Sequence, residues 1–568
     1  MVDVLGGERG VPGGIRVSQE HGGGLAKHWI RTGCRVRAWH PLPQPHAIEA
    51  ARRAKHGMSE SLTSSTIHGL KWSYVATVVT FVLQIGVTAV LARLLTPSAF
   101  GLVAMAGVLL YYGQYFAMLG AGQAIVQKAE LSTHDVHTAF TSSLLMGAAF
   151  CALFIALAPL AGILFPDTPG VVTVTRVMSL NFVISGLRGP TEGLLQRRFA
   201  FRAIALTEIG SWVFGYALVG LIMAISGFGA WSLVAASLSA GVLAAAGYTL
   251  LCRHQVGLSL NWRSLKAIYS FGSRVSLIGV GQAVASTLDT LWTGHYLGAG
   301  ATGLYTRATN LASVPLNYFL LSLARVLLPG YSRLQHDRDR LRSVYVVTIT
   351  VVAAIGMPIA WGIAGASRQV ILTLLGSQWT AAVPVLAVLA LAVPLTMLTH
   401  ISAIMCEATA TLNVKIAITA ARIAWFAALL AILSRYGIVG IAAAFAVSEL
   451  ITHVAYLPVI RRMLNLGSAD LWSAYSIGLP AGLITGLTLF GLNAGLTRLG
   501  WPALGILAVQ LALGALLLLG TVTKARGGEV WHEIRYRLDG AGYRAGNAGL
   551  AAWIIRRVDA LSGLSSAD

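Results

Sequence analysis

The chain has 568 residues, of which 56% are apolar and only 11% are charged, and its mean hydropathy is +0.71. Soluble domains carry about 25% charged residues, so this composition excludes a soluble globular protein. The formal charge of +20 would suit a nucleic-acid-binding protein, but its basic residues are spread over many loops. That spread is typical of a membrane protein whose basic loops face the cytoplasm, and we expect no nucleic-acid partner.

Residues 1–57 differ from the rest of the chain, because they are basic, rich in Gly and His, and contain no apolar run. Such a composition predicts disorder, and without a continuous apolar core the segment is not a signal peptide. We expect residues 1–66 to form a disordered cytoplasmic arm. Met58 opens a shorter polar lead, MSESLTSSTIHGLKWSY, which runs into the first apolar segment and is the start that we favour.

Apolar stretches of about 20 residues, the length that a helix needs to cross a bilayer, recur from residue 70 to residue 523. These runs are continuous and do not alternate with polar residues, which predicts helices and argues against a β-barrel. The sequence therefore predicts an all-α polytopic membrane protein with about fourteen spans. The predicted spans are 70–92, 98–120, 139–164, 170–187, 204–226, 230–251, 268–292, 302–328, 343–365, 381–404, 413–434, 438–460, 474–496 and 502–523.

The loops between these spans differ in charge, and the difference predicts orientation. Fourteen basic residues lie in even-numbered loops and four in odd-numbered loops. The even-numbered loops hold Lys128, Arg188, Arg197, Arg198, Arg202, Arg253, Arg263, Lys266, Arg333, Arg338, Arg340, Arg342, Arg461 and Arg462. The odd-numbered loops hold Arg93, Arg368, Arg435 and Arg498. Because basic loops stay in the cytoplasm, we expect both termini to be cytoplasmic.

Motifs of covalent chemistry are missing from the sequence. It contains no GxxxxGK[ST], HExxH or GxSxG element, and no predicted loop between spans exceeds about twenty residues. Membrane polymerases and ligases usually carry a large external loop. The four cysteines, Cys34, Cys151, Cys252 and Cys406, form no CxxC pair, and we interpret them as small apolar residues. We therefore expect no enzymatic activity, cofactor or metal.

Two segments suggest an internal repeat. Residues 92–104, ARLLTPSAFGLVA, align without gaps with residues 294–306, GHYLGAGATGLYT, so that Gly101 falls on Gly303. Each segment joins the first two spans of a predicted six-span unit. Because six spans return the chain to the same side of the membrane, we expect parallel repeats about an axis normal to the bilayer.

These segments, LARLLTPSAFGLVAM and HYLGAGATGLYTRATNL, together with EGLLQRRFAFRAIAL in the fourth loop, resemble the multidrug/oligosaccharidyl-lipid/polysaccharide exporter superfamily. Within it, the chain resembles Wzx-type polysaccharide flippases of the colanic-acid exporter branch. Members often have a glycine in the turn after the tenth span, where this chain reads EATATLNVK, with Ala410 in place of the glycine.

The resemblance implies two six-helix bundles in a V, which alternate in access, with two extra helices at the carboxyl end. The bundles would be residues 67–253 and 254–462, the extra helices residues 463–523, and residues 524–568 a cytoplasmic tail. The implied cargo is an undecaprenyl-diphosphate-linked oligosaccharide. A sugar head group is too polar to cross lipid unaided, so its route must be hydrated and must neutralise a diphosphate.

Ionisable residues within the predicted spans are the candidates for that route, because charge in a bilayer needs a cavity or a partner. We expect Arg307 to face the substrate cavity and Asp289 to hold its guanidinium when no cargo is bound. Arg176 is a further cavity candidate. An ion pair with a purely structural role, or an interfacial position for Arg176, is the alternative.

Two glutamates, Glu208 and Glu449, are deep enough in predicted spans to couple transport to an ion. A hydrogen bond that stabilises a bundle is the alternative for both. We expect Arg325 and Arg422 to extend towards the membrane interface.

The sequence thus predicts an inner-membrane flippase for lipopolysaccharide, capsule or exopolysaccharide synthesis, with membrane lipid and a lipid-linked oligosaccharide as its ligands. A polymerase and glycosyltransferases of the same pathway are the expected protein partners. The alternatives are a cation-coupled drug or metabolite antiporter on the same fold, a lipid-II flippase, and a membrane polymerase or ligase. The short loops argue against the last of these. A lipid-II flippase would carry a cluster of cavity arginines on its first two spans, where this chain has only Arg93.

Overall fold

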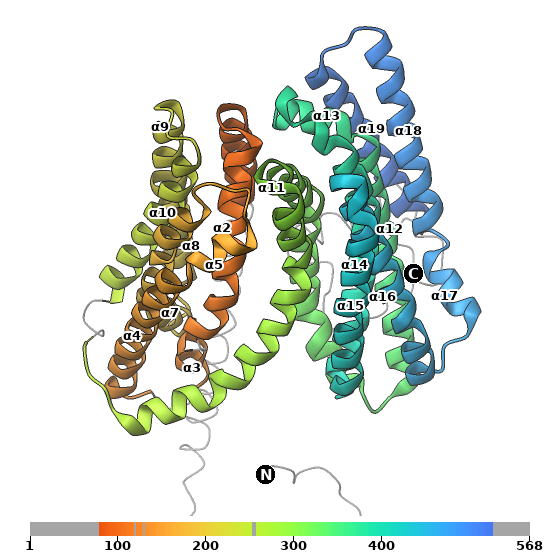
Figure 1. Ribbon diagram of the computed structural model, residues 1–568. Coiled ribbons are helices and arrows are strands. Elements are labelled where there is room, and N and C mark those ends of the chain that lie inside the picture. Colours follow the sequence, from red (N-terminus) through yellow and green to blue (C-terminus); the bar gives the residue numbers. More distant parts are fainter. Residues whose placement is uncertain (1–78, 119–120, 129–130, 253–256, 526–568) are drawn as a thin grey trace, which may run out of the picture. The chain divides into compact units, whose positions relative to one another are not determined.

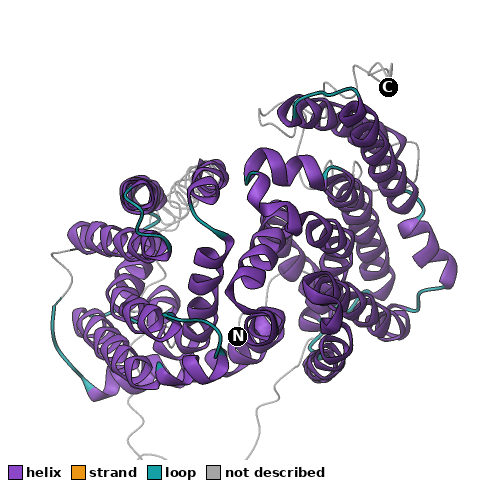
Figure 2. Cartoon of the chain, turned by 45° about the horizontal axis from the view of Figure 1, so that its top comes forward, coloured by secondary structure: helices purple, strands orange, loops and turns teal. Residues whose placement is uncertain are grey.

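The computed structural model describes residues 79–118, 121–128, 131–252 and 257–525, all of which belong to one compact unit, Ser65–Asp568. The predicted arm, residues 526–568 of the predicted tail and the first residues of the first span lie outside the described residues. Every described secondary-structure element is a helix (Figures 1 and 2). The predicted all-α fold is therefore confirmed.

Each of the fourteen predicted spans falls mainly on helix where it is described. Within the described residues, nine helical segments are long and apolar enough to cross a membrane, so the chain is a multi-pass membrane protein, and the count of fourteen stays a prediction. The first described helix is Val79–Leu94. The helices that follow are α2 (Pro97–Met118), α3 (Ala121–Gln127), α4 (Thr133–Leu157), α5 (Pro159–Leu164), α6 (Val171–Met178), α7 (Leu180–Arg197), α8 (Phe201–Gly210), the π-helix η1 (Ser211–Val219), α9 (Gly220–Ile225), α10 (Ala230–Cys252), α11 (Trp262–Leu334), α12 (Arg338–Gly365), α13 (Ser367–Leu374), the 3₁₀-helix η2 (Ser377–Ala382), α14 (Val383–Ala408), α15 (Leu412–Leu433), the 3₁₀-helix η3 (Ser434–Tyr436), α16 (Gly437–Leu464), α17 (Ser468–Tyr475), α18 (Gly478–Arg498) and α19 (Ala503–Ala525).

Residues 79–252 are called the first half of the described chain below, and residues 257–525 the second half. In the first half α4 packs on α7, and α7 and η1 pack on α10; in the second half α12 packs on α14 and α18, and α16 packs on α14 and α15. The most extensive helix pair is α2 with α11, which joins the two halves (Figure 1). The junction between the halves therefore depends on how closely these two helices approach.

The two repeat segments have matching backbone breaks. The chain leaves helix Val79–Leu94 at Leu95 and Thr96 and re-enters helix at Pro97. In α11 the corresponding break is Gly298, whose φ of 77° and ψ of −176° interrupt an otherwise helical run. Gly298 aligns with Thr96 in the repeat. The seventh loop expected from the sequence is thus a break of one residue in α11. Glycine suits this position because it adopts a positive φ without steric cost.

Gly101 and Gly303, the aligned glycines, form the crossing of α2 and α11. A Cβ atom at Gly101 would overlap the carbonyl oxygen of Ala299, and a Cβ atom at Gly303 would overlap that of Pro97. Pro97 and Ala299 are themselves aligned positions of the repeat, so the contact is reciprocal. A reciprocal contact between equivalent residues is what a local two-fold axis produces, and it supports the parallel repeat that the sequence predicts.

The turn after α14 keeps the geometry that a glycine would give it. Ala410 has a φ of +57°, and the backbone amides of Ala410 and Thr411 donate to the carbonyls of Glu407 and Cys406. These bonds close a left-handed helix cap, which alanine adopts at a cost of about 1 kcal/mol. The missing glycine therefore leaves the tenth-loop geometry intact.

The described cysteines behave as small apolar residues. Cys151, Cys252 and Cys406 are free and buried, whereas Cys34 lies outside the described residues.

We predict that Gly101→Ala lowers the free energy of unfolding by about 1–3 kcal/mol, because the added methyl group forces the backbones of α2 and α11 apart. Gly107→Ala is the matched control on the same helix, since a Cβ atom there meets nothing within 4 Å. That control should be neutral or stabilising by up to about 1 kcal/mol, the difference in helix propensity. Unfolding of the purified variants in detergent measures both effects, and equal behaviour of the two would contradict the tight crossing.

Candidate functional site

The carboxyl end of helix Val79–Leu94 is held by side chains of the second half. Trp379 Nε1 donates to the carbonyl oxygen of Ala92 at 2.8 Å, and Gln378 Nε2 donates to the carbonyl oxygens of Ala92 at 2.5 Å and Leu95 at 3.2 Å. Arg93 donates to the carbonyl oxygen of Thr373 at 2.5 Å. The last carbonyls of a helix have no partner within the helix. Trp379 and Gln378 satisfy those at the end of helix Val79–Leu94, and Arg93 satisfies that of Thr373 at the end of α13. We call this set of contacts the Ala92 clasp.

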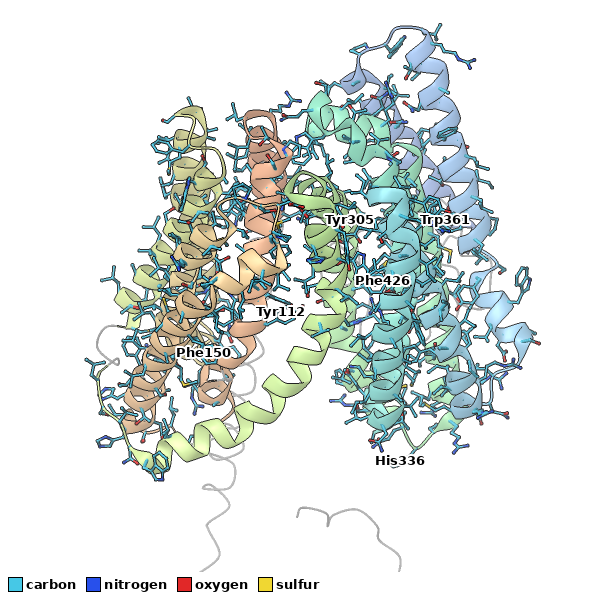
Figure 3. All side chains as sticks on the ribbon, in the orientation of Figure 1. Tyr112, Phe150, Tyr305, His336, Trp361 and Phe426 are labelled. Carbon is cyan, nitrogen blue, oxygen red and sulfur yellow. The ribbon has the colours of Figure 1, made fainter. Side chains whose placement is uncertain are left out.

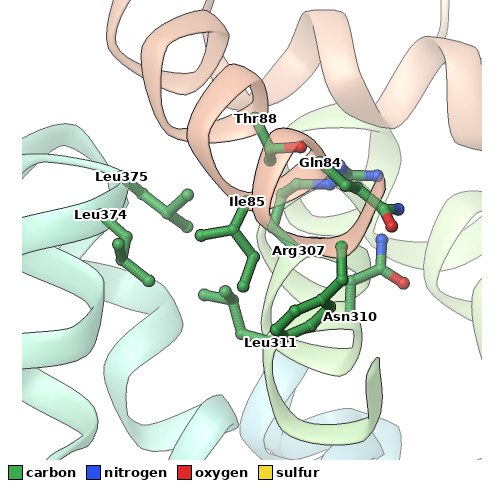
Figure 4. A pocket seen from close by; sticks show the side chains of 9 residues that line it. Gln84, Ile85, Thr88, Arg307, Asn310, Leu311, Leu374 and Leu375 are labelled. Atoms are coloured by element: carbon green, nitrogen blue, oxygen red, sulfur yellow. The ribbon is translucent and has the colours of Figure 1, made fainter. Parts of the chain in front are cut away.

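A pocket opens beside the clasp, between helix Val79–Leu94, α11 and α13, and the volume that water-sized molecules can occupy in it is about 60 Å³. Figure 4 shows the polar groups of Gln84, Thr88, Arg307 and Asn310 along one side of it. Apolar side chains line the rest of the pocket: Phe81, Ile85, Leu311, Leu374 and Leu375. Both halves of the chain thus contribute to one cavity that combines a cation, two amides and a hydroxyl with apolar walls.

Arg307 is the cation of this pocket. Its side chain is partly buried, and its Nε atom is enclosed without a hydrogen-bond partner among the described residues. The guanidinium carbon lies 4.9 Å from the centre of the Phe100 ring of α2, and Tyr216 of η1 is near enough to interact with its charge. An aromatic face attracts a cation but accepts none of its N–H groups in the way that an anion does. The guanidinium therefore keeps donors for a ligand.

Asp289 does not hold Arg307, so the predicted pair is wrong. The Tyr305 hydroxyl donates to Asp289 Oδ2 at 2.7 Å, and the Thr290 amide donates to Oδ1 at 2.6 Å. Tyr305, labelled in Figure 3, precedes Arg307 by two residues on α11. Two residues turn a helix by about 200°, so these side chains lie on opposite faces of α11. Asp289 is 6% exposed and belongs to the interior of the second half.

Arg422 was expected to extend towards the membrane interface, and this expectation is wrong. Its Nη2 lies 2.5 Å from Oε1 of Glu449, whose side chain is 0% exposed, so α15 and α16 share a buried ion pair. The charge of Arg422 also acts on Asp289. A buried carboxylate needs such a partner because its desolvation is costly. The side chain of Arg325, on α11, lies outside the described side chains.

Glu208 belongs to a polar network of the first half. It forms an ion pair with Arg188, which also contacts Glu192 at 3.1 Å, and it accepts a hydrogen bond of 2.7 Å from the Tyr248 hydroxyl. Arg188 was expected in the fourth loop, but α7 continues through it to Arg197. The prediction ended the helix too early because Gly189 and Pro190 follow Arg188, and Pro190 is accommodated inside α7.

The structure does not bring Arg176 to the other candidates. Its side chain is exposed on α6, and it does not line the Arg307 pocket. Sequence reasoning missed Phe100, Gln84, Thr88 and Asn310, which are ordinary residues of amphiphilic helices. One signal was present: Phe100 lies within the first repeat segment, and Arg307 directly follows the second. No group of three His, Cys, Asp or Glu side chains in the described part of the chain is arranged to hold a metal ion.

Comparison with known proteins gives a family match over half of the chain. The family described as "Polysaccharide biosynthesis protein" matches residues 90–384. The succinoglycan biosynthesis transport protein ExoT of Rhizobium meliloti (strain 1021) is 29% identical over 341 residues, which are 59% of this chain and 67% of that protein. The lipopolysaccharide biosynthesis protein WzxC of Escherichia coli (strain K12) is 26% identical over 335 residues, 58% of this chain and 67% of that protein.

Among solved structures, the lipid II flippase MurJ in an inward closed conformation aligns with a TM-score of 0.64 over 81% of this chain and 99% of that chain. The sequences are 14% identical over this alignment. The likeness therefore establishes a shared fold, including helices of both halves.

We predict that Arg422→Ala lowers the free energy of unfolding by about 3–5 kcal/mol, because it leaves Glu449 buried without a partner. The double variant Arg422→Met/Glu449→Leu should regain most of that loss, since it removes both charges and keeps apolar volume. Arg435→Ala, at an exposed arginine, is the control and should change little. Chemical unfolding of the purified proteins measures all three. An Arg422→Ala variant as stable as the Arg435→Ala control would contradict the buried pair.

Proposed function

Because this chain belongs to the polysaccharide biosynthesis protein family, we propose that it is a flippase for an undecaprenyl-diphosphate-linked oligosaccharide. It would carry the repeat unit across the inner membrane for lipopolysaccharide, capsule or exopolysaccharide synthesis. The names of its relatives support this proposal, since they include a succinoglycan transport protein and a lipopolysaccharide biosynthesis protein. The protein moves its lipid substrate and performs no covalent chemistry on it.

The observation that carries the proposal is Arg307, a cation in a pocket lined by both halves, whose enclosed Nε donor has no partner among the described residues. No acidic side chain of the described residues forms an ion pair with it. A guanidinium withdrawn from water is unfavourable unless an anion completes its hydrogen bonds. A diphosphate is such an anion, and its oxygens match the donor geometry of arginine.

The remaining polar groups of the pocket suit the first sugar. Gln84 and Asn310 offer amide donors and acceptors, and Thr88 offers a hydroxyl, all on the same side as Arg307 (Figure 4). Sugar hydroxyls both donate and accept, so they need mixed partners of this kind. The apolar wall on the other side would contact the lipid chain or the sugar ring. The lining of the pocket thus offers partners of the kinds that an amphiphile with an anionic centre needs.

The division of the chain follows from this function. Residues 67–253 and 254–462 would act as two bundles in a V that alternate in access to the cleft, with two additional helices in residues 463–523. Both termini would be cytoplasmic, and the basic even-numbered loops would face the same side. A polymerase on the opposite side and glycosyltransferases in the cytoplasm would complete the pathway.

Glu449 is our ion-coupling carboxylate, with Glu208 as the alternative. Both are held by an arginine, so coupling requires that an ion or proton displace Arg422 or Arg188. Glu449 is favoured because its side chain is 0% exposed, whereas that of Glu208 is 31% exposed. We expect Glu449→Gln to transport independently of an imposed proton or sodium gradient, measured in vesicles. A variant that kept the gradient dependence of the parent would contradict this assignment.

The pocket is tested by Arg307→Ala, which we expect to reduce complementation of a flippase-deficient strain to about a tenth of normal at unchanged protein abundance. Arg307→Lys should retain part of the activity, because it keeps the charge but loses the fork of donors. Arg435→Ala is the matched control: Arg435 also lies 4.9 Å from an aromatic ring, that of Tyr436, but on an exposed face. Full complementation by Arg307→Ala would remove the pocket from the mechanism. Cation-driven dye efflux by the purified protein would instead support the antiporter.

A further inference from the structure

Three consecutive contacts connect the Arg307 pocket with the Ala92 clasp. The Arg307 guanidinium lies over the Phe100 ring at 4.9 Å, and the Phe100 ring meets the Trp379 ring edge to face at 5.4 Å, with an interplanar angle of 73°. The Trp379 indole then donates its N–H to the Ala92 carbonyl at 2.8 Å. A cation, two rings and a helix end are therefore in continuous contact.

These contacts pass back and forth between the halves. Arg307 and Trp379 belong to the second half, whereas Phe100 and Ala92 belong to the first. Phe100 is 4% exposed, and Trp379 and Ala92 are 0% exposed, so the ring–ring contact and the hydrogen bond are withdrawn from solvent. If the halves separate at this end, all three contacts must break. Their combined strength thus sets how readily this end opens.

The contacts of Arg307 with Phe100 and with an anion compete, because the guanidinium cannot form both at full strength. A ring face attracts a guanidinium only through its quadrupole, whereas a diphosphate accepts several charge-assisted hydrogen bonds from it and is the stronger partner. An anion in the pocket would draw the guanidinium away from the ring. Phe100 would then lose the cation that holds it against α11, and the edge-to-face contact with Trp379 would weaken with it.

We propose that an isoprenyl diphosphate in the Arg307 pocket loosens the Ala92 clasp through Phe100 and Trp379. These two residues are positioning residues, because they touch Arg307 and the helix end but need not touch the cargo. The proposal rests on the function proposed above and adds its regulation: the end closed by the clasp opens in response to the diphosphate. An empty transporter would keep this end closed and would not leak.

The reporter is a cysteine introduced at position 92, where the side chain is 0% exposed while the clasp is formed. Ala92→Cys keeps the backbone carbonyl that Trp379 and Gln378 contact, so the clasp itself is unchanged. The four native cysteines are replaced by alanine in the full-length chain, which is placed in lipid nanodiscs. The measured quantity is the rate of labelling by a water-soluble maleimide.

Two diphosphate probes and one neutral probe are compared: farnesyl diphosphate, inorganic diphosphate and farnesol. We expect farnesyl diphosphate to raise the labelling rate about fivefold, the change in a gate equilibrium that loss of one cation–π contact would produce. Farnesol should have no effect. If inorganic diphosphate also raises the labelling rate, a free anion is sufficient to loosen the clasp. If only farnesyl diphosphate raises it, the lipid chain is needed as well.

Trifluorophenylalanine at position 100 provides the sharpest variant, because fluorine withdraws charge from the ring face and leaves its shape nearly unchanged. We expect faster labelling without probe, a smaller response to farnesyl diphosphate and tighter binding of the probe, since Arg307 is released from the ring. Trp379→Phe, which removes the indole N–H, should also label faster without probe. Trifluorophenylalanine at Phe182, a buried ring that packs on Phe150 and Phe154, is the matched control.

Equilibrium binding of radiolabelled farnesyl diphosphate distinguishes failure of the proposed function from failure of the coupling between the pocket and the clasp. Binding that depends on Arg307, with labelling of the Ala92→Cys variant that neither the probe nor fluorination of Phe100 changes, would overturn this inference and leave the proposed function standing. No binding at all would overturn both. A purely structural role for Phe100 predicts that the fluorinated residues at positions 100 and 182 behave alike.

Discussion

The absence of water from the hydrocarbon core is the constraint on which the rest of this structure depends, because each backbone amide and carbonyl must find a partner within the protein. Helices meet that demand along the spans, and breaks are tolerated only where other groups replace the lost bonds. Thr96 and Gly298, the aligned breaks of the two repeats, lie beside the Gly101–Gly303 crossing. The free carbonyls before Thr96 are satisfied by Gln378 and Trp379. Irregular backbone thus lies where the two halves meet, and side chains of the opposite half satisfy it.

The same constraint separates the buried charges into two kinds. Glu449 with Arg422, and Glu208 with Arg188, neutralise each other within one half. Arg307 differs, since an aromatic ring of the other half takes the place of a carboxylate. A ring is a weak partner for a cation, and it leaves the N–H donors available. We therefore propose Arg307 as a binding residue, whereas the paired arginines stabilise buried carboxylates.

Sequence patterns predicted the helices well because lipid imposes a length and a composition that can be read locally. The Gly101–Gly303 alignment indicated a repeat, but it did not predict that these two glycines form the helix crossing. Side-chain partners were harder to predict, because hydropathy does not show how each helix is rotated about its own axis. Asp289 and Arg307 lie at matched distances from Gly298, yet Tyr305 faces Asp289. The pairing of Arg422 with Glu449 depends on how α15 and α16 pack, and the Arg307 pocket depends on three segments far apart in the chain.

The central claim is that a cation between the two halves recognises the diphosphate of a lipid-linked sugar. The most direct test is translocation by the purified protein in vesicles, comparing a fluorescent isoprenyl-diphosphate-linked oligosaccharide with an analogue whose linker is neutral and whose lipid and sugar are the same. The account predicts rapid translocation of the diphosphate compound and little of the neutral one, because only the former completes the hydrogen bonds of Arg307. Equal rates for the two compounds would contradict it.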